Sequence, residues 1–313
     1  MPSDEVIVSH ESALLYHRAR RLAEARGNDL EVESVTDLLA LLGQPKLDVL
    51  VLDGHRRPRA DFMRPHIRTG LDPHALTSVI APGVRVCSPE FALWELGCSS
   101  TNERASLLAY ECCGTFAPDP TVEEGCLYKL PAICSLDEIA DLASQLDGLM
   151  GQRRRANLER MIASTANRAA SPAEARLCHA IVAPRLSGGF GLPKPLLNST
   201  VELNDKARSL TTKSTVDPDG LWADKHLIYE YQGAVHATKE RMESDAGRNN
   251  ALLAMGYQIL YVTKKQVKNY DLYRGLMESI RLALGVRKNI PSQRIVKRQY
   301  ALWKRLFKNN MGE

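Results

Sequence analysis

Two carboxylates and one amide stand at the ends of short apolar runs between residues 216 and 256. Asp219 precedes the first run, and Glu230 and Gln232 lie at the end of the second. A polar helical pattern follows and ends at Gly256, after which another apolar run begins. The order strand, strand, helix, strand brings the three polar residues to one end of a small sheet. Carboxylates collected there are the oxygen ligands that Mg²⁺ or Mn²⁺ prefers, so the pattern predicts a divalent-cation site.

A longer spacing pattern contains these residues. It reads D-x-L-W-x-x-x-x-L-x-x-E-x-x-G-x-x-H, followed by D-x-x-R and by G-Y before an apolar run. Its members are Asp219, Leu221, Trp222, Leu227, Glu230, Gly233, His236, Asp245, Arg248, Gly256 and Tyr257, with Ser171-Pro172-Ala173-Glu174 and Gly191-Leu192-Pro193 upstream. The pattern resembles the small nucleases related to the very-short-patch-repair endonuclease, within the PD-(D/E)xK restriction-endonuclease-like superfamily. The resemblance implies an α/β domain, with a mixed sheet flanked by helices, that hydrolyses DNA with magnesium.

The resemblance assigns roles to the residues of the predicted metal site. It implies that Asp219 and Glu230 are direct metal ligands and that the backbone carbonyl of Tyr231 is a third. A structural explanation also exists for each carboxylate, because an Asp beside Gly220 often forms a turn and a Glu at a strand end is often exposed. Either residue alone favours the structural explanation. Both together, in this spacing, favour the metal site.

Gln232 is the position that departs from the superfamily, which usually has Lys here, although this branch often has Asp. A lysine holds the attacking water and stabilises the transition state. Glutamine is uncharged but can orient a water or contribute an oxygen, and some active restriction enzymes of the superfamily carry it. We therefore assign Gln232 to positioning water. A cation could come from Lys239 instead, although a lysine on an exposed helix is the alternative interpretation.

Three further residues have both a catalytic and a structural interpretation. The resemblance implies that His236 moves a proton or contacts phosphate, whereas a histidine before a helix can also cap or pack. Glu174 follows Ser171 with the spacing of a capping box, yet the resemblance places it beside the metal's water shell. Arg248 either points toward the site or the DNA, as the resemblance suggests, or forms an ion pair along the helix with Asp245.

Composition bounds the class of protein. The chain has 313 residues, of which 44% are hydrophobic and 25% charged, and its net charge is only +4, so total charge does not indicate nucleic-acid binding. No apolar run approaches the ~20 residues of a membrane span, and the N-terminus lacks the features of a signal peptide. Seven cysteines without CxxC spacing indicate reduced, mostly buried thiols. These features predict a cytoplasmic protein without a membrane partner.

The chain divides into four expected segments. They are an α/β module at 1–135, a helical connector at 136–168, the restriction-endonuclease-like domain at 169–286 and a basic amphipathic helix at 287–313. In the first segment, S-H-E-S-A-L-L-Y-H and V-R-V-C-S-P-E-F-A-L-W-E-L resemble the N-terminal region often fused to such nuclease domains, which is similar to antitoxin-type modules of abortive-infection systems. The arginines between residues 56 and 68 favour a solvated face over a phosphate-binding one.

The last segment is rich in lysine and arginine. Basic residues alternate there with an apolar side that can dock on the body of the protein. We expect nucleic-acid contacts from Lys239, Arg248, Lys297, Arg298 and Lys304. Binding to a membrane surface would need the same features, and the nuclease-like pattern favours nucleic acid.

These observations predict a magnesium-dependent DNA endonuclease. The alternative is a catalytically degenerate DNA-binding or regulatory, antitoxin-like protein on the same scaffold, in which the site only grips phosphate. Cleavage of both DNA strands would require two sites, which a homodimer would supply.

Overall fold

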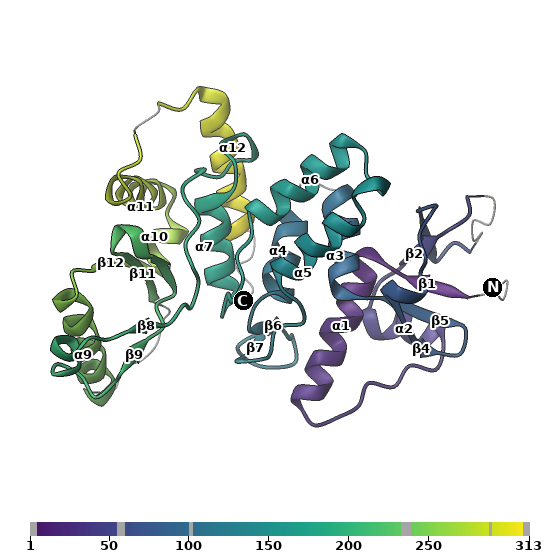
Figure 1. Ribbon diagram of the computed structural model, residues 1–313, viewed down its shortest axis with the longest axis horizontal. Helices are drawn as coiled ribbons and strands as arrows, with labels where there is room; N and C mark the ends of the chain where they lie inside the picture. Colours follow the sequence, from purple (N-terminus) through teal and green to yellow (C-terminus); the bar gives the residue numbers. More distant parts are fainter. Residues whose placement is uncertain (1–4, 55–59, 100–102, 233–238, 288–289, 309–313) are drawn as a thin grey trace. The chain divides into compact units, whose positions relative to one another are not determined.

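The computed structural model describes residues 5–54, 60–99, 103–232, 239–287 and 290–308, and of residues 239–243 it describes the helix without the side chains (Figure 1). The chain forms two compact units, Met1–Ile162 and Ala163–Glu313. Both combine helices with mixed sheets, so the α/β class predicted from the sequence is confirmed. No helix in the described ranges is long and apolar enough to cross a membrane. All seven cysteines are buried, as predicted.

The first unit contains short groups of consecutive strands and of consecutive helices. Its strands are β1 (Val6–Val8), β2 (Leu47–Val51), β3 (Met63–Ile67), β4 (Thr77–Ala81), β5 (Val84–Cys87), β6 (Phe116–Pro118) and β7 (Cys126–Tyr128). Its helices are α1 (His10–Ala25), α2 (Val35–Leu42), α3 (Pro89–Ser99), α4 (Glu103–Cys112), α5 (Leu136–Gln145) and α6 (Gln152–Ala163), with short 3-10 turns η1 (His74–Leu76) and η2 (Asp147–Leu149).

A mixed sheet with the order β3-β2-β1-β5-β4 forms the centre of this unit. β1 is its middle strand, antiparallel to β2 and parallel to β5. Every residue of β2 is buried, in keeping with its mostly apolar sequence. The helices pack on the sheet and on one another, and α3 contacts α1, α4 and α5. The sheet therefore brings the start of α1 close to the residues of β2 and β3.

The helices expected as a connector belong to the core of the first unit. The segment is helical as predicted, and Ser135 begins α5 with a capping box. Leu136, Ile139 and Leu142 of α5 and Leu158 of α6 join the same hydrophobic cluster as the sheet. The boundary between the units consequently falls after Ile162, not at both ends of a separate linker. The apolar stripe of these helices is covered by their own unit.

The second unit begins with a helix and contains a smaller sheet. Its helices are α7 (Pro172–Val182), α8 (Asp205–Arg208), α9 (Lys239–Ala254), α10 (Lys264–Lys268), α11 (Tyr270–Ala283) and α12 (Gln293–Trp303). Its strands are β8 (Val201–Glu202), β9 (Thr215–Val216), β10 (Gly220–Trp222), β11 (Leu227–Gln232) and β12 (Gln258–Thr263). Short 3-10 turns are η3 (Arg185–Ser187) and η4 (Ala223–Lys225), and a short π-helix, η5 (Lys304–Lys308), follows α12.

The order strand, strand, helix, strand predicted for residues 216–263 is confirmed. β10 and β11 form an antiparallel pair, and β11 continues through α9 to β12, which lies parallel to it. The helix ends at Ala254, and Gly256 follows it with φ +83°, a left-handed conformation that glycine adopts without a Cβ penalty. Gly220 allows close packing, since a Cβ there would lie 2.0 Å from the Tyr229 ring. The two strands are thereby held in close register beside the candidate site.

The basic C-terminal helix docks on the second unit as its amphipathic pattern predicts. Leu302, Trp303, Leu306 and Phe307 are buried, and the Trp303 indole Nε1 donates a hydrogen bond to the carbonyl of Val267 at 2.7 Å. The apolar side is therefore committed to the protein's own core.

Candidate functional site

The two carboxylates predicted as metal ligands lie side by side at one end of the β10–β11 pair. Gly220 pairs with Tyr229 in an antiparallel register, which places Asp219, the residue before β10, opposite Glu230. The backbone N–H of Tyr231 donates a hydrogen bond to Oδ2 of Asp219 at 2.5 Å. Glu230 is itself 9% exposed. Two acidic side chains from different strands thus converge on one edge of the sheet.

Glu174, at the start of α7, joins this acidic group while also holding the helix start. Its backbone N–H donates to the Oγ of Ser171 at 3.2 Å, and that hydroxyl donates to the Glu174 carboxylate at 2.8 Å. The carboxylate also accepts from the backbone N–H of Ala170 at 2.9 Å and from the Asn198 amide at 2.8 Å. The predicted capping role is present, with one change: the carboxylate reaches the residue before the N-cap, not the N-cap backbone itself.

Burial and mutual repulsion change the acidity of all three groups. Burial, followed by the charge of Asp219, raises the pKa of Glu174 to about 7. The same two causes raise the pKa of Glu230 to about 7, although Arg248 opposes them. Burial also raises the pKa of Asp219 against the hydrogen bond from Tyr231. The site therefore contains more negative charge than its own cations neutralise.

Arg248 is the cation that faces this group. It reaches from α9 to form an ion pair with the carboxylate of Glu230, and its Nη2 lies 3.5 Å from the carbonyl oxygen of Asp217. The side chain is largely buried, with 17% of its surface exposed. The contact runs across to the strand, as the resemblance suggested, so the alternative of a purely intrahelical pair does not describe this arginine.

The remaining predicted site residues lie in several places. Gln232 is the exposed last residue of β11, next to Tyr231. His236 lies outside the described residues. Lys239 is the first residue of α9, and its side chain is also outside them. Lys297 and Lys304 are exposed on the C-terminal helix. Arg298 on the same helix donates to the carbonyl of Leu186 at 2.5 Å, so part of its donor capacity is used within the protein.

The donor set suits a hard dication in chemical type. Asp219 and Glu230 offer carboxylate oxygens, and their raised pKa values mark charge that a cation would neutralise. In this arrangement Arg248 forms an ion pair with Glu230, and the Tyr231 N–H donates a hydrogen bond to one oxygen of Asp219. In the described part of the chain no three or more His, Cys, Asp or Glu residues are already grouped as ligands of a metal ion. A cation would therefore have to share or replace the Arg248 contact.

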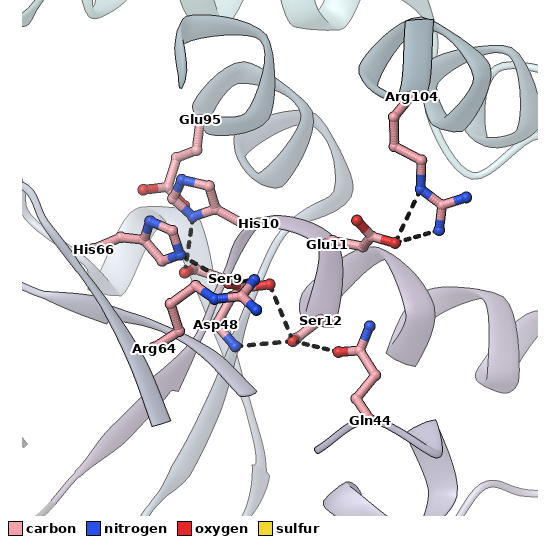
Figure 2. Close-up of polar contacts among 10 residues, drawn as sticks. All are labelled: Ser9, His10, Glu11, Ser12, Gln44, Asp48, Arg64, His66, Glu95 and Arg104. Carbon is pink, nitrogen blue, oxygen red and sulfur yellow. Dashed lines mark hydrogen bonds and ion pairs between the residues drawn. The ribbon is translucent and has the colours of Figure 1, made fainter. Parts of the chain in front are cut away.

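A second polar cluster, in the first unit, was not predicted as a site. Asp48 stands inside the apolar strand β2, and Glu95 stands inside the apolar helix α3. Figure 2 shows these carboxylates near His10 and His66, whose rings stack at 3.7 Å. Acidic residues inside otherwise apolar elements were the sequence signal for this cluster.

Comparison of the chain with protein-family models, with curated proteins and with solved structures gave no match.

Proposed function

We propose that the second unit is a divalent-metal-dependent phosphodiesterase that cuts within DNA, on a restriction-endonuclease-like scaffold. The observation that carries this proposal is the convergence of Asp219 and Glu230 on one sheet edge, with Glu174 adding to their negative charge. The β10–β11–α9–β12 order supports the proposed scaffold. Asp219 and Glu230, with the carbonyl of Tyr231, would hold Mg²⁺ or Mn²⁺.

The bound cation would neutralise charge on the phosphoryl oxygens and lower the pKa of a water molecule. The protein's own groups have separate tasks. The Gln232 amide would orient the attacking water. Glu174, with a pKa of about 7, can accept or release a proton at neutral pH. His236 would donate a proton to the departing oxygen or contact the phosphate.

Binding of the DNA backbone would involve cations on two elements. Arg248 reaches the acidic edge from α9, and it would turn from Glu230 to the phosphate when the carboxylate takes up a cation. Lys297 and Lys304 are exposed on the C-terminal helix, where they can meet phosphates. Lys239 and Arg298 belong to the same proposed set.

Two observations favour a second candidate, a degenerate DNA-binding or regulatory protein. Arg248 already satisfies Glu230, and Gln232 brings no positive charge to the position where the superfamily usually has lysine. In that case the edge would bind phosphate through Arg248 without hydrolysing it. The two candidates differ in one measurable property, cleavage.

Supercoiled plasmid separates the candidates. We expect purified protein to nick it with Mg²⁺ or Mn²⁺, and Asp219→Asn or Glu230→Gln to lower the rate about a thousandfold. Asp224→Asn is the matched control, because Asp224 lies in the turn between the same two strands and its side chain is 74% exposed; this variant should keep the wild-type rate. Salt-sensitive binding without nicking would support the second candidate. Equal nicking by all variants would contradict the proposed site.

A further inference from the structure

The first unit contains a cavity of about 560 Å³ with an uncommon charge pattern. Its basic lining residues are His10, His66, Arg68, Arg153 and Arg154, which come from α1, from β3 and the residue after it, and from α6. None of the lining residues in the described part of the chain is Asp or Glu. The volume falls within the range of about 300–1,000 Å³ that holds small ligands, and the lining favours an anion.

His10 presents an unsatisfied group to this cavity. It is 3% exposed, and its Nε2 has no hydrogen-bond partner among the described residues. The residue follows β1 directly and has φ 48°, which a non-glycine residue rarely adopts. A strained backbone and an unpaired buried nitrogen both carry a free-energy cost. A ligand that accepts or donates a hydrogen bond at Nε2 would offset part of it.

The carboxylates lie behind the histidines. Oε2 of the fully buried Glu95 is 3.3 Å from Nδ1 of His10, and Oε1 is 3.9 Å from Nε of Arg68. Neither oxygen accepts a hydrogen bond from the described residues. Glu95 therefore balances charge at the inner end of the cavity. Nδ1 of His10 also contacts Oγ of Ser9, and Nη1 of Arg68 donates to the carbonyl of Ile67 at 3.4 Å, while Nε2 of His10 stays available to a ligand.

His66 is fixed in a similar way. Its Nε2 lies 2.8 Å from Oδ1 of Asp48, which also accepts from Arg64 at 3.1 Å. Burial would raise the pKa of Asp48, but the hydrogen bond and charge of His66 hold it below its usual value. Asp48 is thus a carboxylate, so the His66 Nε2 must be the donor. Its Nδ1 is left for a second partner, and the ring stacks on His10 (Figure 2).

The arginines of the cavity repel one another. Burial lowers the pKa of Arg68 below its usual value; the charge of Glu95 opposes this, and the charge of Arg154 adds to it. Arg153 and Arg154 are exposed, and neither has an ion-pair partner in the described ranges. Their neighbour Arg155, by contrast, pairs with Asp147. Two cations without partners and one buried cation therefore line the same cavity, and a bound dianion would reduce their mutual repulsion.

We propose that this cavity binds a phosphomonoester of mononucleotide size, with its phosphate held by Arg68, Arg153 and Arg154. Guanidinium groups bind the oxygens of a phosphate dianion in pairs and at fixed angles, and three of them exceed what a single carboxylate requires. The histidines supply hydrogen bonds at the inner end. A free mononucleotide and the 5′-phosphate end of a nucleic acid share this group. The proposal concerns the first unit alone and does not depend on the proposed nuclease.

Calorimetric titration of the full chain in EDTA tests it. The probes are adenosine 5′-monophosphate, adenosine, inorganic phosphate and an oligonucleotide with either a 5′-phosphate or a 5′-hydroxyl. We expect the monophosphate to bind and adenosine not to bind. The double variant Arg153→Gln/Arg154→Gln should weaken binding roughly a hundredfold through two lost charge-assisted contacts. Both substitutions are on an exposed helix surface, so folding is preserved.

Arg155→Gln is the matched control. It removes the same charge from the next position of α6, outside the cavity, and binding should change less than about twofold. An equal loss in this control, or no binding of any phosphate probe, would overturn the proposal. Tighter binding of the 5′-phosphorylated oligonucleotide than of the mononucleotide would identify a nucleic-acid end as the source, and the reverse would identify a free nucleotide. Both results support the phosphate site.

Discussion

Asp48 in the first unit and the Glu174–Glu230 pair in the second are buried carboxylates whose pKa values are shifted in opposite directions. Asp48 in the first unit is 3% exposed, and Glu174 and Glu230 in the second are 7% and 9% exposed. Burial is thus similar, yet the pKa of Asp48 lies below its usual value, whereas those of Glu174 and Glu230 rise to about 7. The difference comes from the neighbours. Asp48 faces a histidine and an arginine, whereas the second unit sets three carboxylates against Arg248.

This comparison sets a structural carboxylate, Asp48, against carboxylates for which we propose a function. A buried acid with matched donors stabilises the fold by itself. A group of acids with too few cations is stable only because the rest of the fold supports it, and it gains from any cation that binds. The first unit shows the opposite imbalance at its cavity, where arginines exceed the carboxylates.

The largest effect on stability should come from removing the matched acid. Asp48→Ala leaves His66 and the hydroxyl of Ser12 without their carboxylate partner. We expect the free energy of unfolding of the first unit to fall by about 3 kcal/mol, as measured by hydrogen exchange of β2 peptides. Glu24→Ala is the control: it breaks an exposed pair with Arg20 and should cost about 0.3 kcal/mol. Similar losses in the two variants would mean that Asp48 is not a structural centre.

A smaller effect should come from adding the proposed cation to the second unit. Millimolar Mg²⁺ or Ca²⁺ should slow hydrogen exchange of β11 peptides by an amount equal to about 2 kcal/mol, the value for a ligand well above its dissociation constant. Asp219→Asn should abolish the effect, because it removes one of the two proposed ligands. The exchange of β2 peptides should not respond. Protection that persists in Asp219→Asn would place the cation elsewhere.

The smallest effect should be a difference in pH dependence. Glu174 and Glu230 keep their protons in the folded unit up to about pH 7 but lose them near pH 4.3 in the unfolded chain. Their stabilising contribution is complete below the unfolded pKa and is lost as pH rises to about 7. Each shift taken alone corresponds to an upper limit of roughly 3 kcal/mol. Because the two acids interact and titrate together, and because both remain partly accessible to solvent, we expect β11 protection to fall by about 1–2 kcal/mol over this range, and Glu174→Gln to remove about half of that fall.

Asp48 supplies the contrast in the same pH titration. Because its folded pKa is lowered, its contribution is present above the unfolded pKa and is lost only as pH falls further through the folded one. Protection of β2 should therefore change little between pH 5 and 7 on account of this group. A parallel fall of β2 and β11 protection would contradict the difference between the units.

Local sequence was sufficient for the predicted metal edge. β10 and β11 are joined by a short turn, so their pairing follows from two apolar runs and the residues between them. Asp219 and Glu230 meet because a hairpin brings its own ends together. Gly256 marked the end of α9 correctly. The contact of Arg248 with Glu230 could be suggested by the resemblance alone, since helical spacing equally allows a pair with Asp245.

The cluster in the first unit could not be found in this way. His10, Asp48, His66 and Glu95 stand on four separate elements, and they meet only because the sheet has the order β3-β2-β1-β5-β4. Nothing in the local pattern fixes that order. The arginine-rich segment was expected to be a solvated face. Arg64 is largely exposed, whereas only 10% of the Arg68 side chain is accessible to solvent, because tertiary packing turns it toward Glu95.

Gly220 has an effect beyond its own position. The ring of Tyr229 occupies the space where any other residue would carry a side chain, so strands β10 and β11 fit together in a single alignment. Sliding one strand by a residue would bring a side chain against that ring and turn Asp219 to the other face of the sheet. The separation of the two acids is therefore fixed by a glycine and an aromatic ring, neither of which carries charge.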